Sequence, residues 1–152
     1  MAAKKAVPAG IREFMGGFPA VVLTQKVSLG EGSTYDVPID GTGTYNLLEI
    51  APGMHIIDIK VEKNDGIADS GTGTSTMKVG DTGDDDRYFQ DTHIKPDASG
   101  HASLAVDGSD KSHKYDDTTP AGQYISAIIG GSDPTDGEFV FTFLYTLEKA
   151  GA

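Results

Sequence analysis

The stretch EFVFTFLYTL, residues 138–147, carries the clearest structural signal in the sequence. Its alternate positions are large and apolar: Phe139, Phe141, Phe143, Tyr145 and Leu147. Such a period of two is typical of a β-strand, because successive side chains point to opposite faces of a sheet. Aromatic residues at four successive positions of one face predict the central strand of a packed sheet.

Two further long stretches show the same alternation. In AVVLTQKVSL, residues 20–29, one face holds Val21, Leu23, Val27 and Leu29 and is interrupted by Gln25. In MHIIDIKVEK, residues 54–63, charged residues alternate with Ile57, Ile59 and Val61. Shorter strands are predicted over residues 34–39, 44–51, 73–80, 86–90, 101–106, 112–117 and 122–130.

The punctuation between these stretches points to one class of fold. Pairs such as Asp40-Gly41, Pro52-Gly53 and Asp107-Gly108 supply the backbone conformations that tight turns need. About eight to ten short strands with frequent turn signals predict an all-β, jelly-roll-like antiparallel β-sandwich. An open immunoglobulin-like sandwich is the competing interpretation, but the chain lacks the Cys–Trp–Cys hallmark of that fold.

The first 19 residues differ in kind from the rest. At 152 residues the chain predicts one domain, which we place at residues 20–152, preceded by an extended N-terminal arm at residues 1–19. The arm mixes prolines and glycines with apolar residues that cannot alternate into a sheet. Those residues either cover the sandwich or dock on another chain. We favour docking, with a partner interface formed by Ile11, Arg12, Phe14, Met15 and Phe18.

Charge and composition exclude several classes of protein. The net charge is −11, and an acidic body argues against a nucleic-acid partner, which needs clustered Lys and Arg. No cysteine is present, so disulfides, thiolate metal sites and cysteine nucleophiles are excluded. No stretch is long and apolar enough to predict a signal peptide or a membrane span, so we expect synthesis in the cytoplasm and no membrane partner.

The acidic stretch VGDTGDDDRYF, residues 79–89, is the candidate site. It fails the EF-hand pattern, because Gly83 is third from Asp81 and Phe89 is sixth from Asp84. An irregular calcium loop stays open as an alternative. The favoured interpretation is a surface turn in which a carboxylate caps backbone amides and Arg87 neutralises a neighbour, a pair of the kind that contributes about 0–1 kcal/mol.

Catalytic motifs are absent from the sequence. It contains no G-x-S-x-G, H-E-x-x-H or G-x-x-x-x-G-K-[ST] pattern, and its four histidines lack zinc spacing. Paired carboxylates of the glycosidase type are defined by distance in space, so the sequence leaves them open. We predict no enzyme activity, no cofactor and no metal.

The segment STMKVGDTGDDDRYF, residues 75–89, resembles a motif of small all-β proteins that decorate, or cement, the capsids of tailed bacteriophages. In that motif a strand carries V-G-D, and a short acidic turn leads to D-R-Y or D-R-F. The strong strand before it and the final strand GEFVFTFLYTL are also similar, and the resemblance spans about residues 45–147. The matching positions are Val79, Gly80, Asp81, Asp86 and Arg87. We interpret them as structural, with Gly80 at a bend and Asp81 and Arg87 locking the turn.

The resemblance implies a virion protein that stabilises an assembled capsid by bridging neighbouring major capsid subunits from outside. Its partners would be the major capsid protein and itself, as a dimer or trimer, and no catalytic residue would transfer. The alternative is a carbohydrate-binding jelly roll, with or without calcium. That function needs exposed aromatic platforms, for which the candidates are Tyr35, Tyr45, Tyr88 and Tyr115.

Overall fold

The computed structural model describes residues 20–64, 75–90, 100–104, 112–132 and 138–148. Within these ranges the chain forms nine β-strands. They are β1 (Ala20–Glu31), β2 (Val37–Ile39), β3 (Gly43–Glu49), β4 (Met54–Asn64), β5 (Thr76–Gly80), β6 (Gly100–Ser103), β7 (His113–Lys114), β8 (Tyr124–Gly130) and β9 (Glu138–Glu148).

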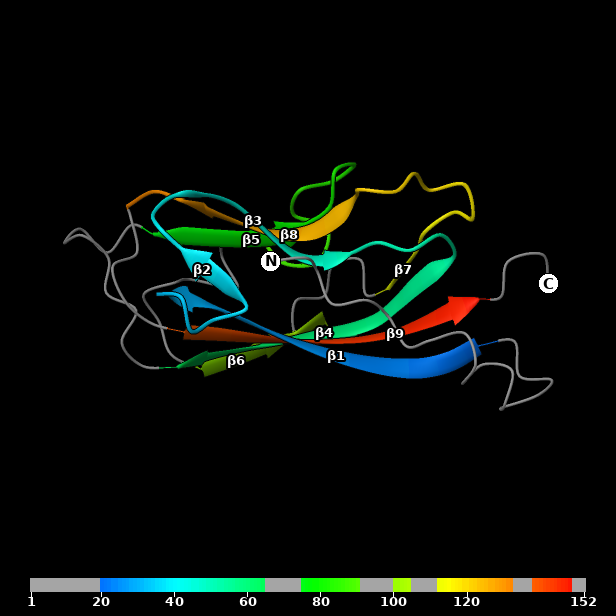
Figure 1. Ribbon diagram of the computed structural model, residues 1–152, viewed down its shortest axis with the longest axis horizontal. Coiled ribbons are helices and arrows are strands. Elements are labelled where there is room, and N and C mark those ends of the chain that lie inside the picture. Colours follow the sequence, from blue (N-terminus) through cyan, green and yellow to red (C-terminus); the bar gives the residue numbers. More distant parts are fainter. Residues whose placement is uncertain (1–19, 65–74, 91–99, 105–111, 133–137, 149–152) are drawn as a thin grey trace.

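The strands build two sheets that face one another (Figure 1). The larger sheet has the order β2-β1-β9-β4-β6, with β7 also paired to β4, and the smaller has the order β3-β8-β5. From β3 to β6 the chain alternates between the sheets at each strand, and the last strand pairs with the first. The predicted all-β, jelly-roll-like sandwich is therefore confirmed. The described pairings are antiparallel except β1–β2, which is parallel.

Strand β9 is the centre of the larger sheet, as the sequence predicts. It pairs with β1 on one side and with β4 on the other. Its inward residues are buried, with Phe139, Phe141 and Phe143 fully so, and adjacent rings lie 6.3 Å apart. Burial of this apolar row against the smaller sheet supplies much of the core.

Strand β4 departs from the predicted alternation at one point. Ile56, Ile59 and Val61 are fully buried, whereas Ile57 is only half-buried. The register against β9 shifts between Ile56 and Asp58, which is the mark of a β-bulge. A bulge adds one residue to a strand and so exchanges the two faces beyond it. The prediction that Ile57 shares the inward face was therefore wrong.

The strand predicted at residues 86–90 is also absent. The chain there is a turn that touches β5 through one bridge, between Val79 and Phe89. Tyr88 and Phe89 are fully buried in the hydrophobic core, so their apolar character reflects core packing rather than a strand.

Candidate functional site

The acidic turn leaves β5 at Asp81 and closes on the same strand. The Val79 N–H donates to the Phe89 carbonyl at 3.0 Å, and the Tyr88 N–H donates to the Val79 carbonyl at 3.0 Å. Within the turn, the Asp81 N–H donates to the Asp84 carbonyl at 2.8 Å. The buried side chains of Tyr88 and Phe89 fix the end of the turn, so the loop has its backbone bonded to β5 at both ends.

Gly80 lies directly beneath this backbone. A Cβ atom at Gly80 would lie 2.2 Å from the Asp84 carbonyl oxygen and 2.3 Å from the Asp85 carbonyl carbon. Since real Cβ atoms do not approach backbone so closely, only glycine allows the turn to fold over the strand. The sequence placed a bend at Gly80, and the structure shows a close backbone approach there.

Asp81 is the centre of a hydrogen-bond network. Its Oδ1 accepts from the backbone N–H groups of Gly83 at 2.9 Å and Asp84 at 3.0 Å. Its Oδ2 accepts from Arg87 Nε at 2.7 Å and from the Tyr115 hydroxyl at 2.8 Å. Both oxygens are thus fully used, as a buried carboxylate requires.

The Asp81–Arg87 pair is not the exposed surface pair that the sequence suggested. The side chain of Asp81 is 5% exposed and that of Arg87 is 16% exposed. Burial alone would raise the pKa of Asp81, but the hydrogen bonds from Tyr115 and Arg87, with the Arg87 charge, lower it overall. Burial would lower the pKa of Arg87, and the bond to Asp81 raises it instead. Both groups are therefore held in their charged forms.

Two tyrosines extend the network into the core. The hydroxyls of Tyr88 and Tyr115 lie 2.5 Å apart, and because Tyr115 donates to Asp81, Tyr88 donates to Tyr115. Burial raises the pKa of both hydroxyls, which keeps them neutral and able to donate. The chain of bonds thus runs inward from the carboxylate.

The network connects the two sheets. Arg87 Nη1 lies 3.2 Å from His113 Nδ1, and the His113 ring packs edge-on against Tyr115 with centroids 4.7 Å apart. His113 belongs to β7, which pairs with β4 of the larger sheet, whereas Asp81 follows β5 of the smaller one. The cluster of Asp81, Arg87, His113, Tyr115 and Tyr88 therefore acts as a polar cross-link between the two sheets.

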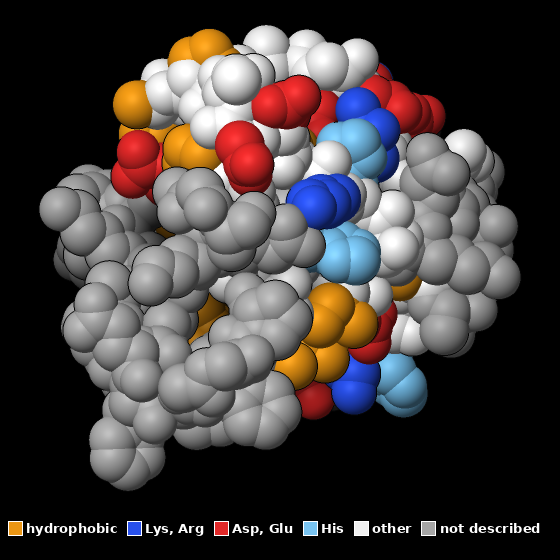
Figure 2. Space-filling view, turned by 90° about the vertical axis from the view of Figure 1, so that its right-hand side faces the viewer, with side chains coloured by type: hydrophobic (Ala, Val, Ile, Leu, Met, Phe, Trp, Pro, Cys, Tyr) orange, Lys and Arg blue, Asp and Glu red, His pale blue; other side chains and the backbone are white. Residues whose placement is uncertain are grey.

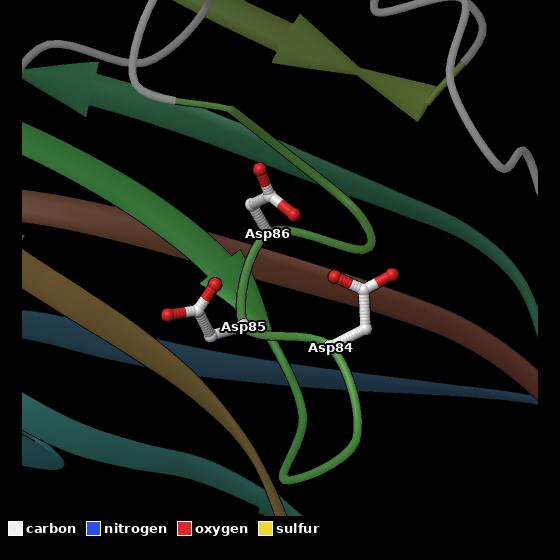
Figure 3. Close-up of side chains that lie close together, drawn as sticks. All are labelled: Asp84, Asp85 and Asp86. Carbon is white, nitrogen blue, oxygen red and sulfur yellow. The ribbon is translucent and has the colours of Figure 1, made fainter.

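The remaining carboxylates of the turn point outward. Figure 3 shows Asp84, Asp85 and Asp86 leaving the turn in different directions, with Asp85 turned away from Asp84. Lys78 Nζ lies 2.6 Å from Asp85 Oδ2. A hydrogen bond with Asp84, together with nearby negative charge, raises the pKa of Asp86. One carboxylate oxygen from each residue lies within 4.8 Å of the others, so these three are the described residues that could hold a cation.

The structure separates the residues that the sequence grouped together. Gly80, Asp81 and Arg87 lie in one buried arrangement, while Asp86 belongs to the outward-facing group. The arm residues Ile11, Arg12, Phe14, Met15 and Phe18 lie outside the described residues. Sequence reasoning missed the part played by Tyr115, which is 34 positions from Asp81 and carries no local signal.

The aromatic platforms required by the carbohydrate alternative are mostly not available. Tyr88 and Tyr115 are buried in the network. The Tyr45 hydroxyl donates to the Gly41 carbonyl at 2.7 Å, which holds that ring against its own loop. A hollow of about 180 Å³ on the smaller sheet has mixed polar lining from Thr44, Asn46, Asp81, Thr82, Gly122, Tyr124 and Ser126. It is smaller than the usual ligand pocket of about 300–1,000 Å³.

The surface at one end of the sandwich mixes charges in spite of the acidic total. Figure 2 shows Lys, Arg and His side chains forming a band down the described part of this face, bordered by Asp and Glu. A hollow of about 350 Å³ is lined by Lys114, Tyr115, Asp116 and Asp117. Within the described ranges, no helix is long and apolar enough to cross a membrane.

Comparison with known proteins identifies the fold through solved structures. No family model and no curated protein matches the chain. A chain of the cyanophage Pam1 capsid asymmetric unit is 19% identical, with a TM-score of 0.63 over 95% of this chain and 94% of that one. A chain of the acid-stable capsid of Helicobacter pylori bacteriophage KHP30 is 13% identical, with a TM-score of 0.56 over 86% and 94%. A chain of the Ralstonia phage GP4 capsid is 13% identical, with a TM-score of 0.54 over 86% of each.

Proposed function

We propose that this chain is a structural virion protein that binds the outside of an assembled phage capsid and stabilises it by bridging neighbouring major capsid subunits. The observation that carries the proposal is the likeness to chains of three phage capsids, which for cyanophage Pam1 spans nearly the whole of both chains. The jelly-roll sandwich is thus matched as a complete unit. The V-G-D turn, on which the sequence resemblance to capsid decoration proteins rests, supports the same function.

The arrangement of the site fits a protein that works through its surfaces. Both carboxylate oxygens of Asp81 accept hydrogen bonds from groups of the protein itself. The cluster around Asp81 therefore stabilises the fold, and Asp81 is not available as a catalytic base. We assign capsid attachment to the N-terminal arm, through Ile11, Arg12, Phe14, Met15 and Phe18. The protein would be made in the host cytoplasm and would reside on the capsid surface of the virion.

The test is co-sedimentation of the purified protein with capsids of its own phage, in both the immature and the expanded form. Saturable binding to expanded shells, with a higher temperature of shell disruption, is the expected result. Replacing Ile11, Phe14, Met15 and Phe18 together by serine should abolish binding and leave thermal unfolding of the free domain unchanged. Absence of binding to either shell form would refute the function, and binding that survives the four serines would refute the role of the arm.

A further inference from the structure

In the described part of the chain, the first strand of the larger sheet has one edge that is unpaired over most of its length. Residues Ala20–Gly30 of β1 pair continuously with β9. On the other side β2 pairs only with Leu29, Gly30 and Glu31. Figure 1 shows β1 along the margin of its sheet, with β2 beside one end. Among the described residues, positions 20–28 of β1 therefore have a strand on one side only.

Hydrogen bonds identify which residues face this edge. The Ser28 N–H donates to Asp36 Oδ2 at 3.0 Å, so it points away from β9. In an antiparallel ladder every second residue directs both backbone groups to the same side. Val22, Thr24 and Lys26 therefore present their backbone groups to the open edge. Gln25 Nε2 donates to the Lys26 carbonyl at 3.0 Å, as expected if this carbonyl faces outward.

Three other sheet margins, β2, β6 and β3, are short or irregular, whereas the β1 margin is long and regular and carries a single lysine, Lys26. Natural edges are kept short, bulged, or blocked with proline or lysine. β2 has three residues and contains Pro38, β6 has four residues, and β3 has a register shift between Asn46 and Leu48. β1 is 12 residues long, and its register against β9 is continuous from Ala20 to Gly30. Of the large hydrophobic side chains described, Val22 is the exposed one, at 59%.

The charge along this edge suits a second copy of the same chain. The stretch AVVLTQKVSLG, residues 20–30, contains one lysine and no carboxylate, in a chain with 23 acidic residues. Two copies can thus meet along this edge without placing carboxylates of one copy opposite carboxylates of the other. A strand pair about a two-fold axis is also self-complementary, because each copy offers the same donors and acceptors.

We propose that two copies associate through antiparallel pairing of their β1 strands, centred on Thr24, so that the two larger sheets become one continuous sheet. This register alone pairs the three outward-facing residues with one another: Thr24 lies opposite the second copy's Thr24, and Val22 lies opposite its Lys26. The aliphatic stem of that lysine covers the exposed valine. The Lys26 carbonyl can accept a new bond beside that from Gln25, because a carbonyl oxygen has two lone pairs.

The first test is sedimentation equilibrium of the full chain and two variants at Thr24. Thr24→Pro removes an N–H that points away from β9, so it removes no bond to that strand. Edge strands tolerate proline at such positions. Thr24→Val keeps the backbone donor and is the matched control. We expect the wild type and Thr24→Val to form a concentration-dependent dimer, and Thr24→Pro to raise the dissociation constant at least about tenfold. A monomeric wild type, or a Thr24→Pro dimer of unchanged affinity, would overturn the proposal.

Charge substitutions at Val22 test the register and do not depend on how the strand tolerates proline. Val22→Glu places a carboxylate opposite the second copy's Lys26 and should maintain or tighten the dimer. Val22→Lys places two cations opposite one another and should weaken it. Equal effects of the two substitutions would overturn the pairing centred on Thr24.

Because the chain has no cysteine, single cysteines provide a third test. Thr24→Cys should form a disulfide-linked dimer under mild oxidation, since directly opposed residues in an antiparallel pair lie about 5.5 Å apart between Cα atoms, within disulfide range. Thr44→Cys, on the exposed edge of β3, is the control and should cross-link far more slowly. Equal rates would contradict the proposal. None of these measurements needs a capsid, so their failure and a failure of capsid binding are separate results.

Discussion

Asp81 and Asp85 lie four positions apart in one turn and differ in almost every physical respect. Asp81 is buried and accepts hydrogen bonds from Arg87, Tyr115 and two backbone amides. The side chain of Asp85 is 55% exposed and pairs with Lys78 at 2.6 Å. The comparison teaches that a short distance does not measure the strength of an ion pair. The Lys78–Asp85 pair is the shorter of the two, but water screens its charges. Removing one partner of the buried pair leaves the other charge buried without a counter-ion, which is far more destabilising.

The largest expected effect comes from adding a side chain at Gly80, because the backbone of the acidic turn folds directly over this residue. In Gly80→Ala the new Cβ would lie 2.2 Å from the Asp84 carbonyl oxygen, so the turn backbone must move. We expect a loss of more than about 4 kcal/mol in the free energy of unfolding, measured by urea denaturation. Gly130→Ala is the control, because its Cβ would meet only the Thr76 hydroxyl at 3.1 Å, and should cost within about 1 kcal/mol. Similar losses for both variants would show that Gly80 has no special steric role.

The next prediction tests the comparison directly. Asp81→Asn leaves the Arg87 charge buried without its counter-ion, and we expect a loss of about 3–5 kcal/mol in the free energy of unfolding. Asp85→Asn removes an exposed partner of Lys78 and should cost about 0–1 kcal/mol. Urea denaturation of both variants at neutral pH measures the difference. Equal losses would mean that burial does not distinguish the two carboxylates.

A smaller effect should follow from removing one donor to Asp81. Tyr115→Phe deletes the hydroxyl that donates to Asp81 and leaves the buried Tyr88 hydroxyl without its acceptor. The expected loss is about 2 kcal/mol in the free energy of unfolding. Tyr45→Phe is matched in chemistry, but its hydroxyl bonds to Gly41 and Asp40 at the surface, and it should cost about 0.5–1 kcal/mol. Thermal unfolding followed by circular dichroism separates the two, and a harmless Tyr115→Phe would remove this tyrosine from the network.

The sequence predicted what depends on local pattern and missed what depends on distant partners. The alternation in residues 138–147 is enough to identify β9 and its inward face, because side-chain direction in a strand follows position alone. The bulge at Ile57 depends on how β4 pairs with β9, so alternation gave the wrong face there. Within the site, Asp81 and Arg87 are close in sequence and their pairing could be predicted. The burial of this pair could not be predicted, because Tyr115 and His113, which cover it, come from a separate part of the chain.

The smallest expected effect is a pH dependence of the free energy of unfolding. It has opposite signs for the buried Asp81 and the outward-facing Asp86. The pKa of Asp81 is lowered in the fold, so its stabilising contribution is present above the pKa of the unfolded chain and disappears as the pH falls through the folded value. The pKa of Asp86 is raised. Its contribution is therefore present below the unfolded pKa and is lost as the pH rises through the folded value.

At neutral pH, Asp86→Asn should therefore slightly raise the free energy of unfolding, because it removes a charge that is repelled by Asp84 and Asp85. This gain should vanish as the pH falls through the folded pKa of Asp86. The loss caused by Asp81→Asn should shrink only at lower pH, between the pKa of the unfolded chain and the lowered folded pKa of Asp81. The two variants should therefore approach the wild type from opposite sides and in two successive pH ranges. Urea denaturation at a series of pH values from neutral to acid measures both curves. If Asp86→Asn destabilises the protein at neutral pH, the carboxylate of Asp86 has a structural role like that of Asp81. The distinction between a buried structural carboxylate and an outward-facing one would then fail.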